Sequence, residues 1–87
     1  MATHKSAIKR HRQSLRRRAR NRHIKVGTGT LVKRFKASVD AGDRDAATTN
    51  LAAATRAIRK AATKGIIPKT RASRQVSRLA KALNGLS

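Results

Sequence analysis

The chain has 87 residues, and its 23 Lys and Arg residues face only three Asp and no Glu, which gives a formal net charge of +20. Alanine accounts for 16 of the hydrophobic residues and only 17 others are large and apolar, so any hydrophobic core must be small. This composition excludes a large core. It also excludes a disulfide-stabilised domain, because there is no cysteine, and a membrane span, because no run of 18 apolar residues occurs.

The first predicted element is a long helix from about Lys5 to Ala41, which would measure ~55 Å at 1.5 Å per residue. Its apolar residues form two stripes on roughly opposite sides, one of Ile24, Leu31, Phe35 and Val39 and the other of Ile8, Leu15, Ala19 and Val26. Gly27 and Gly29 fall where the buried side changes, and each costs a helix about 0.8–1 kcal/mol relative to Ala. We therefore expect a continuous helix that is weakened or bent at these glycines.

A second helix is predicted from Asp45 to Lys64. Asp43 is its expected N-cap, and Gly65 is placed to take the left-handed conformation just after its end. The apolar positions of this segment lie within about 80° of one another at 100° per residue, and they are Ala47, Leu51, Ala54, Ile58 and Ala61. This spacing predicts one buried face.

A third helix is predicted from Pro68 to about Asn84, with Pro68 in the first turn, where its missing N–H would have no partner. Its apolar residues lie within about 60° of each other, and they are Ala72, Val76, Leu79 and Leu83. Four basic residues cluster on the opposite side, namely Arg71, Arg74, Arg78 and Lys81. One face should pack, and the other should be free for a polyanion.

Short connections between these segments predict an all-α fold, a three-helix antiparallel bundle that forms one domain over residues 1–87. The second and third helices are long enough to cover only about residues 22–40 of the first. Residues 5–21 should therefore project beyond the bundle, so that residues 1–21 form a basic N-terminal extension of the first helix.

The basic residues of this projecting segment point in almost every direction around the helix, and the first 39 residues contain no acidic side chain. The counter-charge should come from a partner, and the abundance of Arg favours phosphate, which a guanidinium can hold through two oxygens. There is no Trp or Tyr, and Phe35 belongs to the expected core, which argues against base stacking on single strands. The pattern favours folded nucleic acid recognised through its backbone and shape.

The candidate contact residues comprise the basic side chains of the projecting segment and of the bundle, with a few polar ones. They are Lys5, Lys9, Arg10, Arg12, Gln13, Ser14, Arg16, Arg17, Arg18, Arg20, Asn21, Arg22, Lys25, Arg59, Lys60, Lys64, Lys69, Arg71, Arg74, Ser77, Arg78 and Lys81.

Other classes of function have weaker support in the residues. His4, His11 and His23 have no cysteine or carboxylate near them in sequence, so we expect no metal and no other cofactor. The three Asp fall within one turn, which argues against an enzyme and a small-molecule substrate. A cationic helix on a membrane surface would lack the usual interfacial Trp or Phe. A solvated basic face and a histone-like DNA-binding protein remain as alternatives.

Four strings along the chain resemble one family. They are M-A-x-x-K-S-A-x-K-R-x-R-Q-S-x-x-R-R-x-R-N at residues 1–21, A-G-D at 41–43, A-A-x-K-G-x-I-x-K at 61–69 and S-R-L-A-K-x-L-N at 77–84. Together they are similar to the bacterial small-subunit ribosomal protein twenty family over nearly the whole chain.

The resemblance implies a structural, non-catalytic constituent of the 30S subunit in the cytoplasm, which binds 16S ribosomal RNA directly and stabilises its folded form during assembly. It also implies other small-subunit proteins as neighbours, and we expect neither a membrane partner nor a homo-oligomer. Pro68 and Thr70 depart from the His and Asn that are usual in the family, and Gly27 and Gly29 replace better helix formers.

Overall fold

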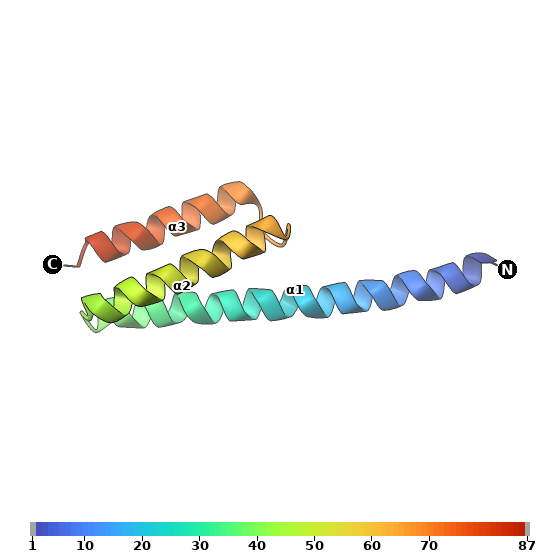
Figure 1. Cartoon of the computed structure of the whole chain (residues 1–87), viewed down its shortest axis with the longest axis horizontal. Coiled ribbons are helices and arrows are strands. Elements are labelled where there is room, and N and C mark those ends of the chain that lie inside the picture. Colours follow the sequence, from blue (N-terminus) through green and yellow to red (C-terminus); the bar gives the residue numbers. More distant parts are fainter. Residues whose placement is uncertain (1, 87) are drawn as a thin grey trace.

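Three helices make up most of the computed structural model, which describes residues 2–86, with side chains from residue 5 onward. α1 spans Ala2–Asp40, α2 spans Arg44–Thr63 and α3 spans Lys69–Asn84, and no strand occurs among the described residues. Successive helices run antiparallel, and α1 continues far beyond the other two (Figure 1). The predicted all-α bundle with a projecting first helix is confirmed, and the molecule is 67 Å long but only 22 and 14 Å across.

In the turn between α1 and α2, Asp43 both closes the end of α1 and caps the start of α2. Gly42 adopts a φ of 69°, and the Asp43 N–H then donates to the Ser38 carbonyl at 3.0 Å, which closes the end of α1. The Asp43 carboxylate in turn accepts a hydrogen bond from the Ala46 N–H at 3.1 Å. Asp43 is therefore the N-cap of α2, as predicted, and it allows the chain to reverse within three residues.

The turn between α2 and α3 also closes as the sequence indicates. Gly65 has a φ of 75°, and the Ile66 N–H donates to the Ala61 carbonyl at 2.9 Å. This hydrogen bond, between residues five positions apart in sequence, is typical of a Schellman motif. The prediction for Pro68 needs a correction, because its ψ of 144° is extended and places it at the N-cap rather than in the first turn. α3 thus begins at Lys69, and the Pro68 carbonyl accepts from the Ala72 N–H at 3.0 Å.

α2 lies between its neighbours and carries much of the core. Phe35 of α1 and Ile58 of α2 are fully buried, and the other buried residues are Val32, Ala47, Ala54, Ala61, Ala72 and Leu79. The small alanine side chains allow the helix axes to approach closely, so few large residues are needed to fill the space between them. The predicted α2 stripe is confirmed, with Leu51 half-buried.

The packing of α1 against α2 confirms one of the two stripes predicted for α1. Phe35 is buried and Ile24, Leu31 and Val39 are half-buried, while Asn50 of α2 donates to the Ser38 hydroxyl at 2.6 Å. Val32, which the predicted stripe omits, is also buried. Val32 lies about 60° from Phe35 and 20° from Val39 around α1, so it belongs to the same face, at the edge that lines the groove between α1 and α3.

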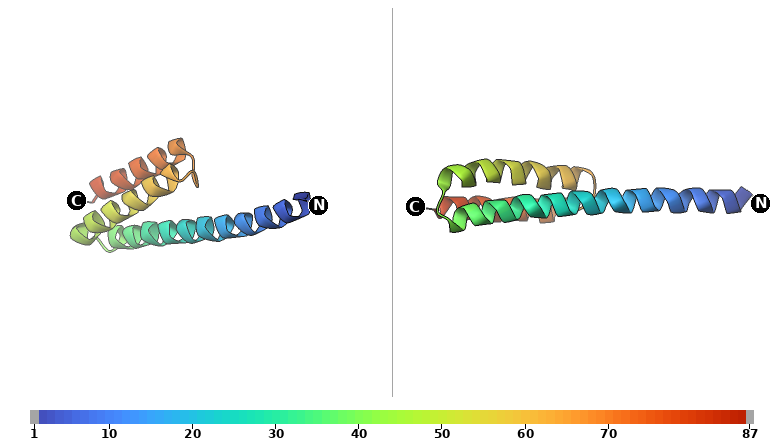
Figure 2. Two further views of the ribbon diagram at one scale, coloured as in Figure 1. Left: turned by 45° about the vertical axis from the view of Figure 1, so that its right-hand side comes forward. Right: turned by 90° about the horizontal axis from the view of Figure 1, so that it is seen from below.

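α1 stays continuous through Gly27 and Gly29 and curves gently, without a sharp kink (Figure 2). The hydroxyls of Thr28 and Thr30 donate to the carbonyls of Ile24 and Val26, one turn earlier, at 2.8 and 2.9 Å. The helix is therefore continuous, as predicted, and it has a gentle curve in place of a sharp bend at the two glycines.

α3 packs along α2 but makes few contacts with α1. Figure 1 and the left view of Figure 2 show α1 and α3 diverging toward the α2–α3 turn. The bundle is thus open along the α1–α3 side.

Candidate nucleic-acid interface

The most exposed part of the molecule is the segment of α1 that lies beyond the bundle, residues 5–20, which we call the rod. Every side chain of the rod is exposed, and Asn21 is the first half-buried residue among the side chains of α1 that the structure describes. α2 and α3 end at this level along α1 (Figure 1). The first helix therefore projects beyond the bundle, as predicted.

The rod carries eight basic residues among its 16 positions, and they are Lys5, Lys9, Arg10, Arg12, Arg16, Arg17, Arg18 and Arg20. At 100° per residue these side chains surround the helix on all sides. The chain has no acidic residue before Asp40, which lies at the far end of α1. No carboxylate of the rod can neutralise these charges, so a polyanion is the partner that fits the surface.

One side of α1 brings several of the predicted contact residues together at the base of the rod. Ser14, Arg17, Arg18, Asn21, Arg22 and Lys25 line an open hollow of about 620 Å³ together with Val26. The Asn21 Oδ1 atom is buried and accepts no hydrogen bond within the chain.

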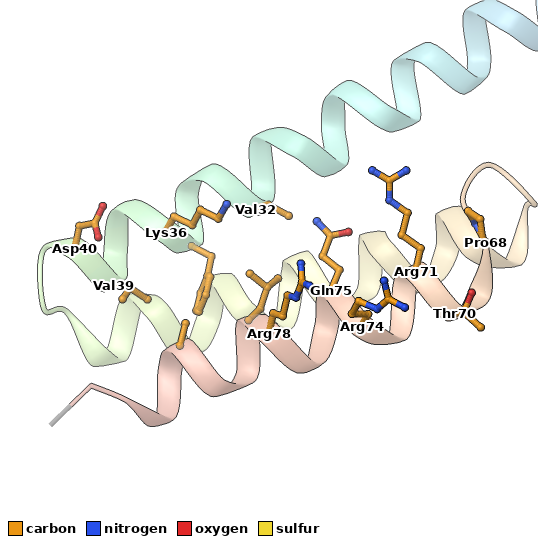
Figure 3. A pocket seen from close by; sticks show the side chains of 13 residues that line it. Val32, Lys36, Val39, Asp40, Pro68, Thr70, Arg71, Arg74, Gln75 and Arg78 are labelled. Carbon is orange, nitrogen blue, oxygen red and sulfur yellow. The ribbon is translucent and has the colours of Figure 1, made fainter.

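A second basic surface lines the open side of the bundle. A groove of about 730 Å³ runs between α1 and α3, with Phe35, Val32 and Leu79 among the residues that line it. The side chains of Arg71, Arg74 and Arg78 come from α3 and that of Lys36 from α1 (Figure 3).

Lys36 and Gln75 line this groove, but the sequence did not mark them as contact residues. Nothing in the period of α1 distinguishes Lys36 from the other exposed lysines. Lys36 lines the groove because α3 lies on that side of α1, and this placement is set by the tertiary structure and not by the local sequence.

The remaining predicted residues lie apart from this groove. Arg59, Lys69 and Ser77 line a hollow of about 500 Å³ between α2 and α3, which includes none of the groove-lining residues. Lys60 and Lys64 are exposed at the C-terminal end of α2, and Lys81 is exposed near the end of α3. The structure thus divides the basic face predicted for α3, with Arg71, Arg74 and Arg78 in the groove and Lys81 outside it.

The acidic residues lie at the opposite end of the bundle. Asp40, Asp43 and Asp45 all belong to the α1–α2 connection or its flanking turns, whereas the rod leaves the bundle near the α2–α3 turn (Figure 1). Lys64 and Lys69 flank that second turn. The molecule is therefore polarised along its length, and the rod end attracts anions most strongly.

The described residues contain neither a membrane-spanning helix nor a cluster of metal ligands. None of the helices combines the length and the apolar character that a bilayer crossing requires. No group of three or more His, Cys, Asp or Glu side chains is arranged to hold a metal ion; His4 lies outside the residues with described side chains.

Comparison with known proteins agrees with this geometry. The family model described as ribosomal protein S20 matches residues 2–84. Proteins named small ribosomal subunit protein bS20 are 52% identical in Pelobacter propionicus and 51% identical in Trichlorobacter lovleyi, each over 86 residues that cover 99% of both chains. The protein of that name in Maridesulfovibrio salexigens is 44% identical over the full length of both chains. The chain therefore belongs to the ribosomal protein S20 family.

Proposed function

We propose that this protein is a structural constituent of the small ribosomal subunit, which binds 16S ribosomal RNA through phosphate-backbone contacts and stabilises the folded RNA during assembly. The observation that carries the proposal is the rod, whose eight basic residues are all exposed and have no carboxylate among them. A protein with this surface gains most by lying against a dense array of phosphates, because each contact releases condensed counterions.

The energetics of the free chain support a partner that binds the folded form. The core holds only three large buried residues, Val32, Ile58 and Leu79, besides Phe35, and the remaining buried residues are alanines. A fold of this kind is only marginally stable on its own, and a ligand that binds the folded state adds stability by mass action. The RNA and the protein would thus stabilise each other during assembly.

RNA is preferred to DNA on the grounds of family membership, since charge alone would also permit a histone-like role. The names of the relatives place those proteins in the small ribosomal subunit. In the proposed role, this chain would act on the ribosome in the cytoplasm, beside other small-subunit proteins. Its net charge of +20 opposes self-association, and the proposed role is structural rather than catalytic.

Chemical footprinting tests the proposal directly. 16S ribosomal RNA is probed with and without the full-length protein, in the presence of an excess of duplex DNA as competitor. We expect protection of a small set of backbone positions that persists in the competitor. Protection that disappears in the excess of duplex DNA would instead support the histone-like alternative, and no protection at any protein concentration would overturn the proposal.

A further inference from the structure

The side of α1 that faces away from the core carries an apolar line through the basic surface. Ile8, Leu15 and Val26 are the exposed large hydrophobic residues of the described chain, with 45, 50 and 61% of their surface accessible. Ala19 lies on the same line, because the spacings of 7, 4 and 7 residues place all four within about 40° of one another at 100° per residue. We call these four residues the apolar strip.

The strip borders a surface hollow rather than lying on a uniformly convex surface. Leu15, Ala19 and Val26 line an open hollow of about 470 Å³, together with Arg18, Arg22 and His23. The core-facing residue Phe35 lies about 180° away around the helix, so α2 and α3 cannot cover the strip. Apolar surface that the chain itself leaves open in this arrangement is a candidate contact surface.

Two rows of arginines flank the strip symmetrically. Arg12 and Arg16 lie about 40° and 80° to one side of its centre, and Arg22 and Arg18 lie about 40° and 80° to the other. All four side chains are exposed. A partner that covers the strip therefore meets cationic groups on both sides, and it must present an uncharged band between two lines of negative charge.

A nucleic-acid duplex has this arrangement, because sugars and base edges lie between two phosphate strands. An α-helix with its side chains is about 10–12 Å across. Side chains cannot reach into the deep, narrow major groove of duplex RNA, whereas its minor groove is wide and shallow and displays riboses. The minor groove of duplex DNA, at about 6 Å, is too narrow for a helix. The major groove of duplex DNA, at about 12 Å, would also admit a helix, so the choice of RNA rests on the proposed function. Within duplex RNA, the shape selects the minor groove.

We propose that the apolar strip seats the rod in the minor groove of a duplex segment of ribosomal RNA. Ile8, Leu15, Ala19 and Val26 lie against the riboses, while Arg12 and Arg16 contact the phosphates of one strand and Arg18 and Arg22 those of the other. This inference rests on the proposed function, which it extends by naming the surface of the RNA that the rod contacts.

A chemical probe on the strip tests the orientation of the rod. Because the chain has no cysteine, a single introduced cysteine can carry an iron chelate that releases hydroxyl radicals. Ile8→Cys and Leu15→Cys place the probe on the strip. Ser6→Cys is the matched control, since it lies about 160° around the helix from Ile8 and is also exposed.

With full-length protein bound to 16S ribosomal RNA, we expect the strip probes to cleave both strands of one duplex, with maxima displaced in the 3′ direction on each strand. The Ser6→Cys probe should cleave that duplex weakly. Equal cleavage from both faces, or cleavage confined to single-stranded loops, would overturn the inference. Intact RNA binding with no cleavage from Ile8→Cys or Leu15→Cys would also overturn it and would point to a protein neighbour, while leaving the proposed function in place.

Affinity measurements give an independent readout. Ile8→Gln with Leu15→Gln should weaken RNA binding roughly tenfold, because less apolar surface is buried, and the salt dependence should not change, because no phosphate contact is lost. Thermal unfolding should be unaffected, since both residues lie outside the bundle. Unchanged affinity would overturn the inference. Failure of the unaltered protein to bind the RNA would instead remove the proposed function itself.

Discussion

We expect the removal of two neighbouring charges from the rod to weaken RNA binding without destabilising the bundle. Arg17 and Arg18 are exposed and precede Asn21, the first half-buried residue among the described side chains of α1, so neither side chain belongs to the bundle. Changing both to alanine should leave the free energy of unfolding of the bundle nearly unchanged, because alanine is at least as favourable as arginine in a helix. The loss should appear in RNA binding.

The magnitude follows from counterion release. Each phosphate contact contributes roughly 0.7–0.9 to the slope of log K against log salt concentration. Arg18 is one of the proposed phosphate contacts, whereas Arg17 lies about 180° from the apolar strip, so the double substitution should reduce that slope by about 0.7–0.9. Between 50 and 200 mM salt the affinity of the variant should therefore fall about three- to fourfold less than that of the unaltered protein. At low salt the variant should bind more weakly.

The measurement is a titration of labelled 16S ribosomal RNA at several salt concentrations, beside thermal unfolding of the free protein by circular dichroism. Lys33→Ala with Arg34→Ala is the matched control, since it removes the same charge from exposed positions of the same helix, outside the candidate contacts. Its slope should stay close to that of the unaltered protein. Equal slope changes in both variants would show that only net charge matters, and a lower melting temperature for the rod variant would place those arginines in the fold.

Four further results are expected. The affinity of the unaltered protein for 16S ribosomal RNA should fall by roughly 10³–10⁵ between 50 and 200 mM salt, as about 6–10 phosphate contacts require, and a flat response in filter binding would contradict a phosphate-dominated interface. Amide hydrogens of residues 5–20 should exchange faster than those of the bundle in the free protein and slow on RNA binding, because a helix without tertiary contacts is marginal in water; strong protection without RNA would contradict this. Gly27→Ala and Gly29→Ala should each stabilise α1 by about 0.4–1 kcal/mol, since both glycines are helical and an added Cβ meets open space. Gly42→Ala should instead destabilise the protein, because Gly42 has a φ of 69°. If all three substitutions changed the free energy of unfolding with the same sign in denaturant titrations, the assignment of two helical glycines and one turn glycine would be refuted. Phe35→Ala should cost about 3–5 kcal/mol, enough to abolish cooperative thermal unfolding of so small a core, and an unchanged melting curve would show that Phe35 is not its centre.

The helix ends show why much of the fold could be predicted. The Asp43 cap and the glycines at 42 and 65 act through hydrogen bonds to residues three to five positions away, so their effect is already contained in the local sequence. Pro68 shows the limit of that reasoning. Its fixed φ suits both the N-cap and the first turn, and its extended ψ depends on the path by which the chain returns to α2.

The candidate interface divides in the same way. The rod could be predicted from length and charge, because α2 and α3 are too short to cover α1 and the basic residues before Asp40 have no acidic neighbours. The division of the α3 arginines and lysines between two surfaces could not be predicted. Periodicity shows which residues share a helix face, but it does not show which neighbouring helix that face meets.

The amino-acid sequence by itself thus determined three helices, the Asp43 cap, the Gly65 turn and the projection of the first helix, since these depend on short-range hydrogen bonds and on lengths, and its sum of charges predicted a polyanionic partner. Only the tertiary structure decided that α3 packs on α2 and leaves the α1–α3 side open, which sets Lys36 opposite Arg71, Arg74 and Arg78. That outcome depends on how closely the alanine-rich faces of the helices approach one another in space, a contact between residues far apart in the chain that no local pattern records.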